Sequence, residues 1–347
     1  IARGFEHHVF ENMRAAPFQG NLYPVNPRHG SVLGEKCYGS VASIPEVPDL
    51  IVIATPANTV ADLIHDAGVA GVRNAVVLSG GFAEIGEEGR LRAKLVKAEL
   101  ARYNMRMIGP NGVGIMRPSV GLNATFASAP ARAGSLALIS QSGAVCTAIL
   151  DWAATTEIGF SSVISLGGAL DLDFGELLDY LVHDRETRSI LLYVEGVRDA
   201  RGFTSALRAA ARVKPVIVFK SGRHAAGTQA VTSHTGALAG SDAVFDAVLA
   251  RAGAVRVKSS LQLFAAARIL ATGKRPAGNR LAIVTNGGGP GVVAADCVID
   301  NQLELATLAR ATVEKLNATL PVHWSHANPM DIIGDATPQR FAAEIGR

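Results

Sequence analysis

The sequence has few cysteines and lacks long apolar runs, and both features narrow the class of protein. Cys37, Cys146 and Cys297 lie far apart, so they form neither a disulfide framework nor a metal-ligand spacing. No apolar run approaches the ~18 residues that a membrane-spanning helix requires. The chain opens at Ile1 without an initiator Met and without a signal-peptide pattern. We therefore expect a cytoplasmic protein that does not contact the membrane.

The sequence also lacks an excess of charge of one sign. It carries 33 Lys and Arg against 30 Asp and Glu, a formal net charge of +3, and has no block of like charges. This balance argues against nucleic acid as the main partner, whereas a few local donors suffice for a small anionic ligand. Apolar residues make up 48% of the 347 residues, which indicates a globular protein of two or three domains.

A short β-branched apolar run followed by a helical stretch recurs along the chain. The runs occupy residues 50–55, 75–79, 136–140, 163–166, 190–194, 216–219 and 281–285. Because polar residues do not alternate within them, these runs predict strands that are buried on both faces. The helical stretches between them predict βαβ units, hence an α/β fold with mostly parallel sheets. In such sheets ligands bind beyond the carboxyl ends of the strands.

Two unpatterned stretches, residues 127–134 and 271–279, suggest domain boundaries. We expect a first domain over residues 1–130, a second over 131–272 and an incomplete third over 273–347.

The segment over residues 220–241 carries the most chemical information. It follows a predicted strand, is rich in Gly, Ala, Ser and Thr, and contains His234. A loop of small residues lets a side chain project and lets the backbone wrap around a ligand. A neutral imidazole is a competent nucleophile toward phosphorus near pH 7. We expect Ser241 or Asp242 to cap the next helix. Taken alone, a surface or capping role for this histidine stays open.

Two other strand ends suit phosphate chemistry. The turn Ser140-Gln141-Ser142-Gly143 follows a buried strand and opens a helix expected over residues 145–154, and the N–H groups and dipole of such a helix start favour an anion. Glu195 ends an apolar strand, where a carboxylate can hold the second nitrogen of an imidazole. An ordinary capped helix and a solvated glutamate are the open alternatives.

The first domain lacks the features of a dinucleotide site. Residues 23–28 are expected to end a strand and residues 54–56 to end the next. A dinucleotide site requires a G-x-G-x-x-G turn and an acidic residue at the second strand end, but Asn26 and Arg28 stand there instead. This difference argues against NAD and favours a phosphorylated ligand such as CoA.

Taken together, these motifs resemble the NDP-forming acyl-CoA synthetases. That superfamily includes the α subunit of succinyl-CoA synthetase, the ADP-forming acetyl-CoA synthetases, and lysine acetyltransferases in which the module is fused to a GNAT domain. The matching stretches are YPVNPRH, PDLIVIATPANTV, GPNGVGI, LISQSGAV, ILLYVEGV, SHTGALAGSDAVFDAVLARAGAVRV, TNGGGPGV and NPMDIIGDA. They span almost the whole chain.

The resemblance implies a fold and a set of site residues. The fold is a Rossmann-like CoA-binding domain followed by flavodoxin-like ligase domains with parallel sheets. His234 matches the phosphorylated histidine and Glu195 the carboxylate that steadies it, and no metal site is implied. The implied phosphate-binding residues are Ser140, Gln141, Ser142, Gly143 and Gly236. The implied CoA-binding residues are Asn26, Pro27, Arg28, Ala54, Thr55, Pro56 and Asn111.

The sequence departs from the family pattern in several places. We expect the family's first strand and Gly-rich CoA loop to precede Ile1. Gly112 stands where a Cys commonly follows the GPN motif, and Gly168 stands where Asn is expected. The ATP-grasp domain, which binds ATP or ADP with Mg, is absent from this sequence. It is therefore expected as a partner subunit or as a later part of the same polypeptide. We also expect the protein to form an oligomer.

The resemblance implies a reaction in three transfers. In the synthetic direction the phosphohistidine forms first from NTP, the acyl phosphate forms second, and the CoA thiol then attacks the acyl carbon. The rival function is a CoA-sensing or acyl-CoA-sensing module that regulates a fused GNAT domain. A third class, an NAD-dependent oxidoreductase, is disfavoured by the missing fingerprint. Nothing in the sequence identifies the acyl substrate, for which acetate is the first expectation.

Overall fold

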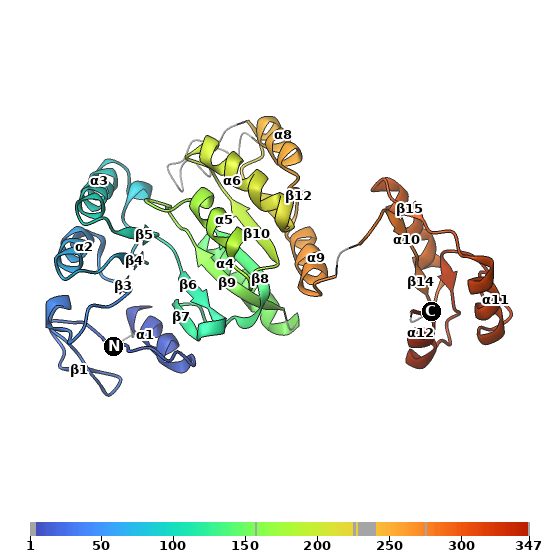
Figure 1. Ribbon diagram of the computed structural model, residues 1–347, viewed down its shortest axis with the longest axis horizontal. Helices are drawn as coiled ribbons and strands as arrows, with labels where there is room; N and C mark the ends of the chain where they lie inside the picture. The colour runs from blue at the N-terminus through green and yellow to red at the C-terminus, as the bar shows by residue number, and fades with distance from the viewer. Residues whose placement is uncertain (1–4, 157, 225–226, 228–240, 275, 346–347) are drawn as a thin grey trace. The chain divides into compact units, whose positions relative to one another are not determined.

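The computed structural model describes residues 5–156, 158–224, 227, 241–274 and 276–345 (Figure 1). The chain divides into two compact units, Ile1–Lys274 and Arg275–Arg347. In the described part of the chain, no helix is both long and apolar enough to cross a membrane.

The first unit begins with a small parallel sheet in the order β3-β4-β5. Helices α2 and α3 lie side by side and pack on one face of this sheet through residues such as Ile64 and Val96 (Figure 1). Helix α1 packs on the other face through Val9. The bounds are α1 (Phe5–Ala15), β3 (Ile51–Ile53), α2 (Val60–Val69), β4 (Asn74–Val77), α3 (Glu87–Arg102) and β5 (Arg106–Ile108), with a hairpin of β1 (Ser31–Val32) and β2 (Glu35–Lys36) before β3.

A larger sheet follows, whose described strands run in the order β12-β11-β10-β8-β9-β6-β7. Strands β8 to β12 are parallel to one another, whereas β6 pairs antiparallel with both β7 and β9. The strands are β6 (Gly114–Arg117), β7 (Leu122–Thr125), β8 (Arg132–Ser140), β9 (Gly159–Ser165), β10 (Ser189–Val194), β11 (Val216–Lys220) and β12 (Val255–Val257).

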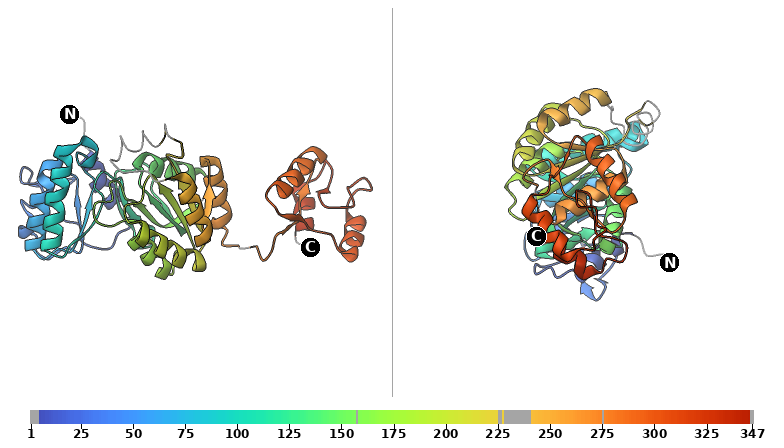
Figure 2. Two further views of the ribbon diagram at one scale, coloured as in Figure 1. Left: turned by 90° about the horizontal axis from the view of Figure 1, so that it is seen from above. Right: turned by 90° about the vertical axis from the view of Figure 1, so that its right-hand side faces the viewer.

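Helices cover both faces of the larger sheet (Figure 2). On one face α5, α6 and α8 pack against Ile139 and Leu192; on the other, α4 and α9 pack against Leu138 and Leu191. Since successive strand residues face opposite helical layers, both sets must be apolar, which explains the unbroken apolar runs. The helices are α4 (Gly143–Thr156), α5 (Phe174–His183), α6 (Ala200–Val213), α8 (Asp242–Ala252) and α9 (Ser260–Ala271).

Backbone hydrogen bonds join the two sheets of the first unit. The loop after β5 accepts from the loop after β9: the N–H of Gly168 donates to Pro110 O at 2.8 Å and that of Leu170 to Gly109 O at 2.9 Å. At the open end of the β6–β7 hairpin, the Asn12 side chain of α1 donates to the carbonyls of Thr125 and Ala127, each at 2.9 Å. The hairpin therefore belongs to the larger sheet and is also bonded to the first helix.

The second unit contains two short parallel strand pairs, β13 with β15 and β14 with β16. Its core gathers around Trp324, Leu316 and Ile332. The elements are β13 (Arg280–Leu281), β14 (Val284–Thr285), α10 (Gly288–Asp300), β15 (Glu304–Leu305), α11 (Arg310–Thr319), β16 (Met330–Asp331) and α12 (Pro338–Ile345).

The prediction of mostly parallel sheets is confirmed, and each predicted apolar run contains strand residues. The prediction that residues 23–28 end a strand is wrong: Val25 forms only an isolated bridge with Tyr38. Pro24 and Pro27 lack the N–H groups that would extend a ladder. The division into three domains at residues 130 and 272 stays a prediction.

Candidate functional site

The turn after β8 is built from its own side chains. The Ser140 hydroxyl is buried and donates to the carbonyl of Ser142 at 2.7 Å. The Ser142 hydroxyl accepts from the N–H of Val145 at 3.3 Å, so it caps α4, which begins at Gly143. The first N–H groups of a helix have no partner within it, and they lie here at the carboxyl edge of the sheet.

Gln141 joins this turn to the end of β10. Ser140 and Tyr193 are paired in register, so Gln141 and Glu195 both lie just beyond this pair. The Gln141 Oε1 atom accepts from the N–H of Glu195 at 2.6 Å and from that of Gly196 at 3.0 Å, and its Nε2 donates to the Gly196 carbonyl at 2.8 Å. The structure thus brings together the predicted helix start and the predicted carboxylate.

The end of β10 is a buried, charged environment. Glu195 is 7% exposed. Burial is the main cause that raises the pKa of the neighbouring Tyr193 phenol. A hydrogen bond with Ser221 lowers this pKa, and the negative charge of Glu195 raises it. A carboxylate fixed at this position suits the orientation of an imidazole brought to the same edge.

His234 and Gly236 lie outside the described residues, so their positions stay predictions. The described ends of their segment are Lys220, the last residue of β11, and Asp242, the first residue of α8, with Ser241 at the N-cap as expected. Because β12 is parallel to β11, α8 returns from the carboxyl edge of the sheet. The segment that contains His234 therefore starts and ends at the edge that carries Glu195.

Sequence analysis did not single out Lys220, although it is 3% exposed at this edge. Its signal in the sequence is a lysine that directly continues the apolar run over residues 216–219. Burial lowers the pKa of its ammonium group, while the charges of Asp242 and Glu195 oppose that shift.

The predicted CoA residues fall into two groups. Thr55 follows β3 and Asn111 follows β5, the two outer strands of the small sheet. Ser79, which follows the central strand β4, links them: its hydroxyl donates to the Thr55 carbonyl, and its own carbonyl accepts from the N–H of Asn111 at 2.9 Å. Ala54 is half-buried beside exposed Pro56. Asn111 adopts a left-handed conformation at φ 59°, which Asn tolerates better than most residues.

The second group lies on a separate turn. The Asn26 side chain accepts from the N–H of Arg28 at 2.9 Å, and the Asn26 N–H donates to the Tyr38 carbonyl at 2.8 Å. Pro27 and Arg28 are exposed. The structure therefore presents Asn26 through a fixed turn rather than at a strand end.

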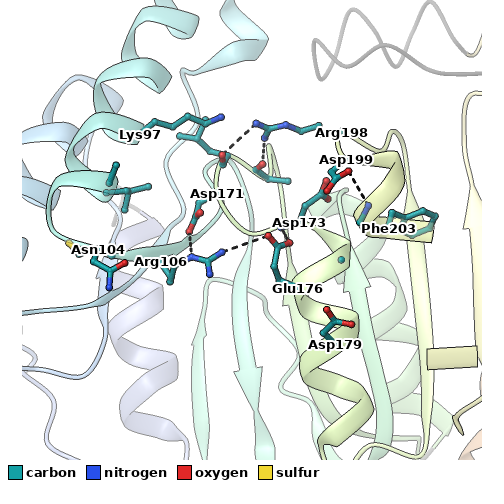
Figure 3. Close-up of a pocket in the computed structure, with 17 residues that line it drawn as sticks. Lys97, Asn104, Arg106, Asp171, Asp173, Glu176, Asp179, Arg198, Asp199 and Phe203 are labelled. Carbon is teal, nitrogen blue, oxygen red and sulfur yellow. Dashed lines mark hydrogen bonds and ion pairs between the residues drawn. The ribbon is translucent and has the colours of Figure 1, made fainter. Parts of the chain in front are cut away.

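A pocket of about 740 Å³ lies on the opposite side of the small sheet, at the start of β5 (Figure 3). Asp171, after β9, accepts from Arg106 Nε at 3.0 Å and from the N–H of Met107 at 2.7 Å, and these two bonds join the two sheets. Arg198 donates to the Gly168 carbonyl at 3.3 Å, which joins two loops of the larger sheet. None of the described residues predicted to bind CoA or phosphate lines this pocket.

Comparison with known proteins decides the family. The model of a CoA binding domain matches residues 4–118, and that of a succinyl-CoA ligase like flavodoxin domain matches residues 133–270. The α subunit of the ADP-forming acetate–CoA ligase II of Pyrococcus furiosus is 40% identical over 97% of this chain and 73% of its own length. The chain belongs to the NDP-forming acyl-CoA synthetase family.

Other relatives place the chain as an α-type module of that family. The ADP-forming acetate–CoA ligase of Methanocaldococcus jannaschii is 41% identical over 95% of this chain, which covers 46% of that relative, about half its length. The solved dinucleotide-forming acetyl-coenzyme A synthetase 1 of Ca. Korarchaeum cryptofilum, in complex with phosphate and ADP, is 35% identical with a TM-score of 0.91 over 96% of this chain and 72% of that chain. The predicted fold, a CoA-binding domain followed by a flavodoxin-like ligase domain, is confirmed.

Proposed function

We propose that this chain is the CoA-binding and phosphoryl-carrying part of an ADP-forming acyl-CoA synthetase, and that His234 carries the phosphoryl group. The observation that carries this proposal is the Gln141 clamp, which holds Glu195 beside the start of α4. A fixed carboxylate and a helix start together suit a phosphorylated imidazole: the first orients the ring, and the second stabilises phosphate charge. The names of the relatives favour acetate as the acid.

The proposed reaction proceeds by three balanced transfers. The γ-phosphoryl group moves from ATP to a ring nitrogen of His234, forming an N–P bond as ADP leaves. A carboxylate oxygen of the acid then takes the phosphoryl group, breaking the N–P bond. The CoA thiolate finally attacks the acyl carbon, and phosphate leaves. Each transfer replaces part of one difficult condensation, which is covalent catalysis.

In this proposal the chain's own groups have separate tasks. Glu195 orients the imidazole and supports its positive charge, while the N–H groups of α4 stabilise the phosphoryl oxygens. Thr55 and Asn111 at the strand ends of the small sheet, together with the Asn26 turn, hold CoA. An ATP-grasp partner subunit or fused domain supplies ATP, ADP and Mg.

The decisive experiment follows phosphate from ATP. The full-length protein is incubated with its ATP-grasp half and γ-³²P-ATP, and acid-labile, base-stable label is expected on His234. His234→Ala should abolish the label, whereas His224→Ala, a histidine of the same segment, should retain it. No Lys or Arg lies between Arg223 and Arg251, so trypsin leaves both histidines on one peptide and fragment spectra must place the phosphate.

Two results would overturn the assignment. Phosphate on a different residue, or full synthetase activity in His234→Ala, would exclude His234 as the carrier. The CoA-sensing regulatory module would then be the better description of this chain.

A further inference from the structure

A buried serine lies between the turn proposed to bind phosphate, residues 140–143, and the turn proposed to bind CoA, residues 109–113. Ser165 is the last residue of β9, is 1% exposed and pairs in register with Ser140, which begins the phosphate turn. Its hydroxyl accepts from the N–H of Val113 at 3.0 Å, and this bond is buried. Val113 comes two residues after Asn111, so the serine hydroxyl holds the end of the CoA turn.

The side chain of Val113 brings the two turns into contact. A Cβ atom placed on Gly143 would lie 3.0 Å from Val113 Cγ2, so the valine packs directly against the first residue of α4. Val113 is 3% exposed and belongs to the same apolar core as Ile149 of that helix. The start of the helix proposed to bind phosphate and the end of the CoA turn therefore touch each other.

The main chain around Ser165 is also packed closely against the CoA turn. A Cβ atom on Gly112 would lie 2.6 Å from the Ser165 carbonyl oxygen, and one on Gly167 would lie 2.4 Å from the Asn111 carbonyl oxygen. Glycine at both positions permits this approach. The end of β9 thus fixes the position of the CoA turn through backbone packing, and the Ser165–Val113 bond adds a directed polar contact.

The proposed reaction depends on this spacing at its last step. Phosphorylation of His234 and transfer of the phosphoryl group to the acid do not involve CoA. The CoA thiolate then has to reach the acyl carbon of a molecule whose phosphoryl group lies at the start of α4. The distance between the CoA turn and that helix start therefore affects the thiolate attack, where a displacement of about 1 Å can cost about 10²-fold in rate.

We propose that Ser165 is a positioning residue for the attack of the CoA thiolate on the acyl carbon. It acts through Val113, whose main chain it holds and whose side chain contacts the start of α4. This inference rests on the proposed function and adds to its last step a residue that does not touch the reacting atoms.

A second buried serine of β9 provides a matched control. Ser161 is also 1% exposed, and its hydroxyl lies 2.7 Å from that of Thr187. Replacing either Ser161 or Ser165 by alanine removes one buried hydrogen bond, so both changes should reduce stability. The Ser161 bond, however, lies toward the amino ends of the parallel strands, whereas Ser165 lies at the carboxyl edge.

The test measures the first and last steps separately for Ser165→Ala and Ser161→Ala, in the full-length protein with its ATP-grasp half. Labelling of His234 from γ-³²P-ATP reports the first step, acetyl-CoA formation at varied CoA reports the last, and thermal unfolding reports stability. Ser165→Ala should lower kcat/KM for CoA at least about tenfold and label His234 at the wild-type rate. Ser161→Ala should lower the unfolding temperature and leave both rates unchanged.

Val113→Ala tests the same junction without changing a polar group. It removes the methyl group that faces Gly143, so it should also lower kcat/KM for CoA and leave labelling unchanged. Val163→Ala is its matched control, because Val163 is 1% exposed and belongs to the same apolar core but lies within β9. This control should lose stability and keep its kcat/KM for CoA.

The outcomes separate this inference from the proposed function. Absence of phosphate on wild-type His234 would refute the proposed function itself. With a labelled wild type, a Ser165→Ala variant that keeps the wild-type kcat/KM for CoA would refute only the role of Ser165, as would one whose labelling falls equally far. If Ser165→Ala does not fold, Val113→Ala decides, and a kcat/KM for CoA equal to that of Val163→Ala would overturn the inference.

Discussion

The side-chain oxygen of Gln141 lies 2.6 Å from the backbone nitrogen of Glu195. This bond and two further bonds to Gly196 fix the turn after β10 from the neighbouring strand. These bonds fix the main chain from which the Glu195 carboxylate projects, and the role proposed for Glu195 depends on such preorganisation.

Gln141→Met should therefore reduce both stability and labelling. The change removes the partners of two N–H groups and one carbonyl, which should lower the free energy of unfolding by about 1–3 kcal/mol. Urea unfolding and the labelling rate measure the two effects. Gln262→Met is the control and should label normally; it removes an exposed side-chain oxygen that accepts from the N–H of Lys258 at 2.7 Å. Normal labelling by Gln141→Met would show that the clamp has no functional role.

Glu195→Gln should keep the fold and slow phosphoryl transfer. The neutral amide preserves the shape of the side chain but cannot support a charged imidazole, and loss of such a partner typically costs about 10²-fold. Single-turnover labelling measures the rate. The control is Glu87→Gln, which changes an exposed residue in the first turn of α3. An unchanged rate would remove Glu195 from the mechanism.

Asp184 should make stability depend on acid pH. It accepts from Arg117 Nη1 at 2.7 Å and Nη2 at 2.8 Å, and from Thr187 at 2.6 Å, and the Arg117 hydrogen bond is the first cause that holds the pKa of its carboxyl well below the usual range. Because the pKa of this carboxyl is lower in the folded protein than in the unfolded chain, where it is about 3.9, its ionisation stabilises the fold above about pH 3.9. This contribution is lost as the pH falls below the pKa of the unfolded chain and toward that of the folded protein.

Asp184→Asn should accordingly lower the free energy of unfolding at pH 7 by about 3 kcal/mol, the low end for a broken buried pair because Arg117 is partly exposed. The difference from the wild type should shrink as the pH falls from about 4. Glu186→Gln, which changes the more exposed partner of the same arginine, should cost less than about 1 kcal/mol. Urea unfolding at several pH values tests both, and equal losses at pH 7 and pH 3 would contradict the assignment.

Gly112 should not tolerate a side chain. A Cβ atom there would lie 2.6 Å from the carbonyl oxygen of Ser165, which belongs to the strand end that the loop packs against. Gly112→Ala should cost about 1–3 kcal/mol of unfolding free energy. Gly168→Ala is the matched control, because its Cβ would meet its nearest neighbour, Pro110 O, at 3.6 Å. Similar unfolding midpoints for the two variants would be inconsistent with this packing.

The ligand of the small sheet should be CoA rather than NADH. Calorimetry on the full-length protein should detect CoA binding and no comparable heat with NADH. Asn111→Gly keeps the left-handed backbone and removes the amide, and it should weaken CoA about threefold to tenfold. Asn104→Gly, at φ 50° and outside the proposed site, should bind normally. Tight NADH binding without CoA binding would overturn the assignment.

The sequence allowed the central strands to be predicted because strands buried on both faces leave unbroken apolar runs. It did not reveal the β6–β7 hairpin, whose residues mix polar and apolar types and which pairs with β9, far along the chain. The prediction of a strand end at residues 23–28 was wrong, because prolines in this stretch prevent a continuous strand. In the site, Glu195 and the Ser140–Gly143 turn were predictable as strand ends, but burial of Lys220 depends on α8 and β12 packing around it.

The bonds from Asn12 to the end of β7 limit how this protein can be recombined with its relatives. A chimaera that joins a foreign CoA-binding half just before β6 keeps the hairpin with its sheet but separates it from α1. A junction just after β7 preserves the α1 contacts but inserts a foreign edge beside β9. A working exchange of this half must therefore preserve both the Asn12 bonds and the pairing of β6 with β9. In such a chimaera α1, the β6–β7 hairpin and β9 should all come from the same parent protein.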